Sequence, residues 1–227
     1  KGDSITLTWE LSEIDAADFS ECVQRTWEYC YDTNRPQPVN TPYTVDRMKD
    51  VLSNFFVESY VNTTPTHYYS GVELKTATCD NTDVAEVGFV GRTLLNAFNA
   101  LEYGSQQNRP ELVNSANSIF DTYLTNGFSP AGFFNEVVHY NRDFKEANLS
   151  IRRQSEGVYA ILNYLDYEKQ HKRKHPEWEK RLKVILDSFL RLQNADGSFP
   201  RKFKDDFSIV DGTGGSTPSA TLPLVMA

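Results

Sequence analysis

The chain has 227 residues, of which 39% are hydrophobic and 24% are charged, and its formal net charge is -8. These values predict one large globular domain with a substantial core. No stretch approaches the roughly 18 consecutive apolar residues that a membrane helix requires, and the acidic balance argues against nucleic acid, whose phosphates need a concentrated cationic surface. The sequence therefore predicts neither a membrane nor a nucleic-acid partner.

The first 14 residues show no periodicity and are expected to form an extended N-terminal segment without the apolar core of a signal peptide. Three cysteines follow along the chain, Cys22, Cys30 and Cys79, and their spacing matches no metal-ligand pattern. The four histidines do not cluster, and no glycine-rich phosphate loop is present. We therefore expect neither a metal nor a cofactor.

Two segments resemble each other at an offset of about 64 to 71 residues, which is longer than the repeat of common helical solenoids. The first segment spans 100–128 and the second spans 164–199, with a weaker copy over 27–56. Each unit has the pattern helix, short turn, helix, long loop. This repeat predicts antiparallel helix pairs.

Apolar positions at helical spacing support these pairs, for example Leu94, Leu95, Phe98 and Leu101 in one helix. Pro110 and Pro176 stand where second helices begin, which is a favoured position for proline. A helix is expected over Val45–Val61, and glycines near 127 and 197 are expected to end two others. The loops are expected at 62–84, 127–150 and 194–216, which are rich in Gly, Pro, Asn, Thr and Asp.

Long and short loops alternate along the chain, so all long loops should lie on one face, at the starts of the first helix of each pair. Loops longer than about 12 residues are usually functional or disordered. We therefore expect the working site on this face.

The string Gln193-Asn194-Ala195-Asp196-Gly197-Ser198-Phe199 closes a second helix and resembles a motif of the six-hairpin glycosidase-like and terpenoid-cyclase-like toroids. In that motif the Gln and the Gly tie a helix end to the next loop, a structural role that the resemblance implies for Gln193 and Gly197. The stretches 153–159 and 214–220 are similar to bacterial carbohydrate-processing toroids, whereas the Asp-rich motif of the cyclases is absent, which disfavours an isoprenoid substrate.

The fold expected is therefore all-α: a single (α/α) toroid domain over 1–227, built from antiparallel helix hairpins. About three and a half hairpins are expected, because a closed six-hairpin barrel needs roughly 300 residues or more at this repeat length. Since the chain ends on an apolar run, we interpret it as a fragment whose expected partner is the remainder of its own toroid.

Glycoside hydrolysis uses two carboxylates on opposite sides of the scissile bond. Three carboxylates of the long-loop face are candidates for catalysis: Glu156, Asp211 and Glu86. Glu156 precedes Gly157, which permits close approach. The structural alternatives are capping of a helix start for Glu156 and Glu86 and an Asp-Gly turn for Asp211.

Aromatic rings that stack on sugars and arginines that hold an acidic sugar are the candidates for substrate binding. They are Tyr68, Tyr69, Phe133, Phe134, Arg153, Phe199 and Arg201. The structural alternatives are rings that plug the rim of the toroid and arginines that pair with Glu156 or Asp205.

The leading hypothesis is a glycoside hydrolase-type domain that acts on an oligo- or polysaccharide, which would favour a secreted or periplasmic location. A polysaccharide lyase, with a base among Tyr68, Tyr69, His67 and His139, is one alternative. A non-catalytic helical-repeat module for binding or scaffolding is the other.

Overall fold

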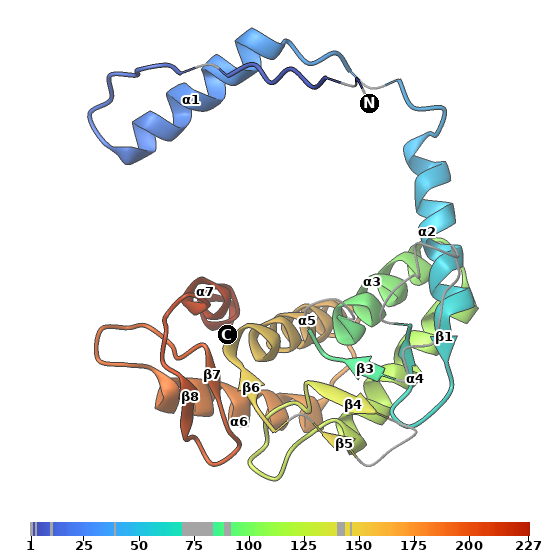
Figure 1. Cartoon of the computed structure of the whole chain (residues 1–227). Coiled ribbons are helices and arrows are strands. Elements are labelled where there is room, and N and C mark those ends of the chain that lie inside the picture. Colours follow the sequence, from blue (N-terminus) through green and yellow to red (C-terminus); the bar gives the residue numbers. More distant parts are fainter. Residues whose placement is uncertain are drawn as a thin grey trace. The chain divides into compact units, whose positions relative to one another are not determined.

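The computed structural model describes residues 2, 4–9, 11–38, 40–69, 84–88, 92–139, 144–145 and 147–227. The chain divides into two compact units, residues 1–44 and 45–227. Within the described residues there are seven helices and eight short strands (Figure 1).

The first unit contains one helix, α1 (Phe19–Asn34). Asp18 is its N-cap and accepts a hydrogen bond from the backbone N–H of Glu21 at 2.9 Å. Arg35 ends the helix in the left-handed conformation. No side chain of α1 is buried. The described residues before it form no helix or strand.

The second unit contains the other helices: α2 (Val45–Ser59), α3 (Thr93–Gln106), α4 (Pro110–Asn126), α5 (Ile151–Gln170), α6 (Pro176–Leu192) and α7 (Thr217–Met226). Pro110 and Pro176 begin α4 and α6, as predicted from the sequence. Short turns join α3 to α4 and α5 to α6, and the helices of each pair lie side by side (Figure 1). The two predicted helix pairs are therefore confirmed, and a pair formed by α1 and α2 stays a prediction.

The helices that begin the pairs form an inner row, in which α5 packs against both α3 and α7. The outer helices α4 and α6 cover this row, and the core lies between the two layers. The rings of Phe120 in α4 and Tyr164 in α5 stack at 3.8 Å within this core, beside the buried Trp178 of α6. Helix packing rather than local propensity holds these helices in place.

The long loops contain short strands where the sequence predicts irregular structure, so the expected all-α class is correct only in being mainly helical. The two-stranded sheet joins β1 (Tyr60–Val61) and β2 (His67–Tyr68). A second sheet has the order β3 (Val84–Glu86), β4 (Val137–His139), β5 (Phe144–Lys145), and a third has the order β6 (Leu149–Ser150), β7 (Lys202–Phe203), β8 (Ile209–Asp211). All neighbouring strands are antiparallel.

Two helix ends differ from the predictions. The helix expected over Val45–Val61 ends at Ser59, because the next two residues pair with β2. The helix expected to reach Gly197 ends at Leu192. Gln193 then bridges to the loop by donating from Nε2 to the carbonyl of Gly197 at 3.2 Å, and Gly197 has a φ of +84°, so the structural role implied for these two residues is confirmed.

Candidate functional site

A polar cavity of about 230 Å³ lies at the start of α5, on the side of the long loops. It is lined by side chains from the segment before α5, from the first turn of α5, from β7 and from the start of α7. The lining residues are Glu136, Asn148, Ser150, Arg152, Arg153, Arg201, Lys202 and Ser216. We call this cavity the α5 pocket.

The third sheet positions the cationic side chains of this pocket. Strand β6 runs directly into α5, and Ser150 of β6 pairs with Lys202 of β7 (Figure 1). The backbone N–H of Ile151, the first residue of α5, donates to the carbonyl of Arg201 at 3.3 Å. This pairing brings Arg201 and Lys202 to the first turn of α5, where Arg152 and Arg153 follow.

A buried carboxylate anchors the floor of the α5 pocket. The side chain of Glu136 has no exposed surface, and its Oε1 accepts from the backbone N–H of Ser150 at 2.5 Å and from Nε2 of Gln154 at 3.0 Å. Its Oε2 lies 3.7 Å from Nη1 of Arg153. A buried charge is tolerated only when it is paired and hydrogen-bonded, so Glu136 fixes the start of α5 and the position of Arg153.

Glu156, the first carboxylate predicted from the sequence, lies one turn further along α5. Its Oε1 is 3.2 Å from Nε of Arg152 and its Oε2 is 3.4 Å from Nε of Arg92. The side chain keeps 19% of its surface exposed, whereas that of Glu136 is fully buried. Glu156 therefore contacts Arg152, which lines the α5 pocket. Because part of its own side chain is exposed, a ligand can still reach it.

Asp211, the second predicted carboxylate, ends β8 and contacts Arg201, which lines the same pocket. Its Oδ2 accepts from Nη1 of Arg201 at 3.1 Å, and its Oδ1 accepts from the hydroxyl of Thr213 at 2.6 Å and from the backbone N–H of Thr213 at 3.0 Å. The hydrogen bonds from Thr213 are the main reason that the pKa of Asp211 lies below its ordinary value, with a smaller contribution from Arg201. The turn expected from the sequence is present, whereas Arg201 pairs with Asp211 and not with Glu156 or Asp205, the partners considered in the sequence analysis.

Glu86, the third predicted carboxylate, is followed by Val87, whose backbone N–H donates to the carbonyl of Glu136 at 3.0 Å. Glu86 lies half-buried on β3 opposite Val137 of β4 and does not line the α5 pocket. Glu156 and Asp211 do not line the cavity either, but each pairs with an arginine that does, Arg152 and Arg201 respectively.

Four of the predicted substrate-binding rings are buried in the core. Phe134 stacks on Phe128 at 5.0 Å, Phe133 packs against Phe203 and Phe207, and Phe199 packs near Phe189. The hydroxyl of the buried Tyr68 lies 3.1 Å from that of Ser115. The structural alternative, in which the rings fill the rim of the fold, therefore fits four of them: Tyr68, Phe133, Phe134 and Phe199. Tyr69 is partly exposed.

The predicted arginines Arg153 and Arg201 both line the α5 pocket. The sequence analysis missed Glu136, Asn148, Ser150, Lys202 and Ser216, the first four of which lie in segments with no periodic pattern. Only Glu136 gave a signal, as an acidic residue that directly follows Phe133, Phe134 and Asn135. An acid within an apolar loop is unusual, because charges are rarely buried without a partner.

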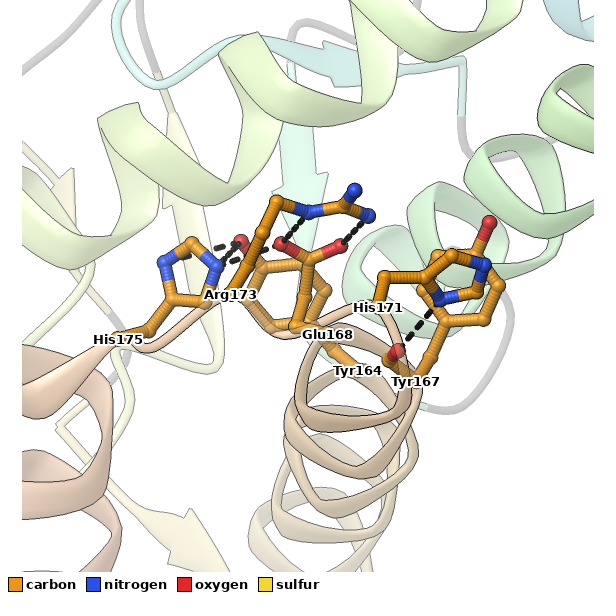
Figure 2. Close-up of polar contacts among 6 residues, drawn as sticks. All are labelled: Tyr164, Tyr167, Glu168, His171, Arg173 and His175. Atoms are coloured by element: carbon orange, nitrogen blue, oxygen red, sulfur yellow. Dashed lines mark hydrogen bonds and ion pairs between the residues drawn. The ribbon is translucent and has the colours of Figure 1, made fainter.

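A second polar cluster lies at the opposite end of α5, about 24 Å away at 1.5 Å per residue. Figure 2 shows Glu168 between Arg173 and His175: Oε2 accepts from Nε of Arg173 at 2.7 Å and from Nε2 of His175 at 2.7 Å, and Oε1 accepts from Nη2 of Arg173 at 2.5 Å. The hydroxyl of Tyr164 lies 3.1 Å from Nε2 of His175. These groups bind one another and close the turn between α5 and α6, so the basic run at 169–175 is partly a structural element.

Among the described residues, no group of His, Cys, Asp and Glu side chains could hold a metal ion. In the same part of the chain, no helix is long and apolar enough to cross a membrane.

No protein-family model and no curated protein sequence matches this chain. Among solved structures, a D-mannose isomerase aligns with a TM-score of 0.57 and 12% identity, over 83% of this chain and 47% of its own. A novel alpha-amylase from Clostridium perfringens aligns with a TM-score of 0.43 and 12% identity, over 71% of this chain and 43% of its own.

The chain therefore spans about half the length of the D-mannose isomerase. At this identity the similarity concerns the fold alone. It confirms the resemblance to (α/α) toroids as a partial match in fold, over about half the length of that structure.

Proposed function

We propose that the chain is a carbohydrate-active toroid domain whose sugar binds in the α5 pocket. The observation that carries the proposal is that Glu156 and Asp211, on two separate elements, each pair with an arginine that lines this one cavity. Two carboxylates beside one sugar site are the requirement for glycosidic bond hydrolysis. The similarity to D-mannose isomerase supports a sugar as the ligand by analogy of fold.

The two carboxylates have different environments, which supports different roles. Hydrogen bonds from Thr213 hold the pKa of Asp211 below its ordinary value, so Asp211 is the ionised partner, acting as nucleophile or base. Glu156 is the acid-base candidate, because part of its side chain is exposed at the edge of the cavity. In this proposal, the substrate separates Glu156 from Arg152 when it binds.

The size and lining of the pocket suit a single sugar unit. Drug-sized ligands occupy cavities of about 300–1,000 Å³, and the α5 pocket has about 230 Å³. Ser150, Asn148 and Ser216 offer hydroxyl and amide groups that can bind sugar hydroxyls.

The lyase alternative has less support from the placement of its candidate bases. His67 and Tyr68 are buried in the core, and neither they nor Tyr69 and His139 line the α5 pocket. We therefore favour hydrolysis, with a binding module as the alternative that experiment must separate from it.

The test is to incubate the purified chain with a panel of neutral and acidic oligosaccharides and to measure new reducing ends, with the ultraviolet absorbance of unsaturated products as the lyase readout. Glu156→Gln is expected to lower hydrolysis by at least about 100-fold, the usual minimum for acid-base catalysis, while calorimetry still detects sugar binding. Lys183→Ala is the control, because Lys183 is exposed on α6 and pairs with Asp187.

Sugar binding without turnover in the wild-type chain would favour the binding module. Hydrolysis that Glu156→Gln leaves unchanged would remove Glu156 from the mechanism. Absorbance of unsaturated products would replace hydrolysis by elimination.

A further inference from the structure

The α5 pocket is cationic although the chain as a whole is acidic. Arg152, Arg153, Arg201 and Lys202 line it together with a single carboxylate, that of Glu136. The chain has a formal net charge of -8. Positive charge is therefore concentrated at this one cavity against the overall balance, and a cavity lined by one sign of charge attracts ligands of the opposite sign.

We propose that the ligand of the α5 pocket is an anionic sugar, one whose carboxylate or phosphate group is held by these cationic side chains. This inference rests on the proposed function, because it names the class of sugar that the same pocket binds. It selects against the neutral sugars that an analogy of fold alone would allow.

The carboxylates around the pocket do not cancel its positive charge. Glu136 pairs with Arg153, Glu156 with Arg152 and Asp211 with Arg201. No ion pair in the described part of the chain joins Lys202 to a carboxylate. Glu156 also pairs with Arg92, so these three carboxylates do not neutralise the four cationic groups that line the pocket.

Arg201 and Lys202 are the best placed of the four to meet a ligand. The side chain of Arg201 is 55% exposed and gives one described hydrogen bond, to Asp211. A guanidinium has five N–H donors in a planar fork that matches a carboxylate or a phosphate. Lys202 adds a compact charge from the neighbouring position, and the pairing of β7 with β6 fixes both beside the first turn of α5.

The carboxylates also hold the pocket open in the ligand-free protein. Four positive charges in one cavity would repel one another, since like charges disfavour each other at close range. The three ion pairs orient the arginines before the ligand arrives, and groups that are positioned in advance bind with a lower cost in entropy. The neutral Ser150, Asn148 and Ser216 are then left for the sugar hydroxyls.

The test is calorimetric titration of the whole chain with matched pairs: glucuronate against glucose, and galacturonate against galactose. Glucose 6-phosphate separates a phosphate ligand from a carboxylate ligand, and acetate and inorganic phosphate serve as anions without a sugar. Each titration is repeated at higher salt, because electrostatic binding weakens as ionic strength rises.

We expect at least one anionic sugar to bind about 10-fold more tightly than its neutral counterpart, and more tightly than acetate or phosphate. Arg201→Ala and Lys202→Ala should each weaken this binding by about 10-fold, as expected for the loss of a hydrogen bond to a charged group. Lys183→Ala, which removes a positive charge from an exposed site on α6, should leave it unchanged.

Equal binding of the neutral and anionic members of each pair, unaffected by the two variants, would overturn the inference and leave the proposed function standing. Anionic sugars that bind no better than acetate and phosphate would overturn both, since the sugar ring would then contribute nothing. Absence of binding by every probe to the folded chain would also overturn both.

Discussion

Oδ2 of Asp211 lies 3.1 Å from Nη1 of Arg201, in an ion pair that joins the end of β8 to the residue just before β7. The same aspartate accepts two hydrogen bonds from Thr213, so its carboxylate is held from both sides. Asp211 is thus both the ionised carboxylate of the proposed reaction and the counterion of an arginine that the substrate is proposed to contact. Removal of the carboxylate should therefore have opposite effects on the two roles: it should lower the rate of hydrolysis but strengthen the binding of an anionic ligand.

We predict that Asp211→Asn abolishes most hydrolysis but tightens the binding of an anionic sugar. Without the charge of Asp211, Arg201 loses its counterion and interacts more strongly with the ligand. Ion pairs near the surface contribute little, so the gain in affinity should be at most about 5-fold. Calorimetry with glucuronate measures the affinity, and a reducing-end assay measures the rate of hydrolysis. Weaker binding of glucuronate by the variant would contradict this account of Arg201.

The second prediction concerns the buried carboxylate of Glu136. Glu136→Ala leaves the backbone N–H of Ser150 without its side-chain acceptor, removes one of the two acceptors of the Gln154 amide, and removes the carboxylate paired with Arg153. Breaking a buried charge pair in this way should lower the free energy of unfolding by about 3 kcal/mol. Urea unfolding measures the change. Asp187→Ala is the control, because Asp187 is exposed, and should change the stability by less than about 0.5 kcal/mol.

If Glu136→Ala unfolds the chain completely, Gln154→Leu gives a milder test of the same contact. It removes only the hydrogen bonds that the Gln154 side chain donates to Phe134 and Glu136 and the one that it accepts from the backbone N–H of Phe134. Stability equal to that of the wild type in both variants would show that Glu136 does not anchor α5.

The helix pairs could be predicted from the sequence because their signals are local. Pro110 and Pro176 mark helix starts, and the apolar spacing of Leu94 and Leu101 identifies a buried face. The α5 pocket could not be predicted in full, because it depends on the pairing of Ser150 with Lys202, which are far apart in the chain. Strands of two or three residues are too short to show the alternation by which strands are recognised.

The burial of the aromatic rings in the loops could not be predicted from the sequence either. Phe133 and Phe199 lie in segments whose composition predicts surface loops, but both rings are buried under those loops. Composition predicts where the backbone turns, whereas burial depends on contacts such as that of Phe133 with Phe203. The arginines were a better guide, because Arg153 and Arg201 both line the pocket.

A third prediction concerns pH and the cluster at the other end of α5. Burial alone would raise the pKa of Glu168, but the hydrogen bonds from Arg173 and His175 outweigh it, so the pKa lies below its ordinary value of 4.5. A carboxylate whose pKa is lower in the folded chain contributes stability that is complete above the unfolded pKa and is lost as the pH falls through the folded pKa. Stability should therefore fall as the pH drops below about 5.

Glu168→Gln should be less stable than the wild type at neutral pH and should lose less stability on acidification. Urea unfolding between neutral pH and about pH 3 measures the free energy of unfolding of both proteins as a function of pH. Glu111→Gln is the matched control: its carboxylate also pairs with an arginine, Arg109, but it is exposed. Parallel pH profiles for wild type and Glu168→Gln would contradict the assignment of this pH dependence to Glu168.

The last prediction concerns the close approach of Gly88 to the first turns of α5. A Cβ at Gly88 would lie 2.9 Å from Cα of Arg153 and 3.0 Å from Oε2 of Glu156. Because one of these contacts is with backbone, it cannot be relieved by rotation of a side chain, and Gly88→Ala should cost about 1–3 kcal/mol of stability. The displacement of Arg153 and Glu156 should also weaken the binding of an anionic sugar. Gly215→Ala is the control, since no atom lies within 4 Å of a Cβ there. If Gly88→Ala binds glucuronate as well as Gly215→Ala and unfolds at the same urea concentration, then the position of α5 relative to this loop does not determine the pocket.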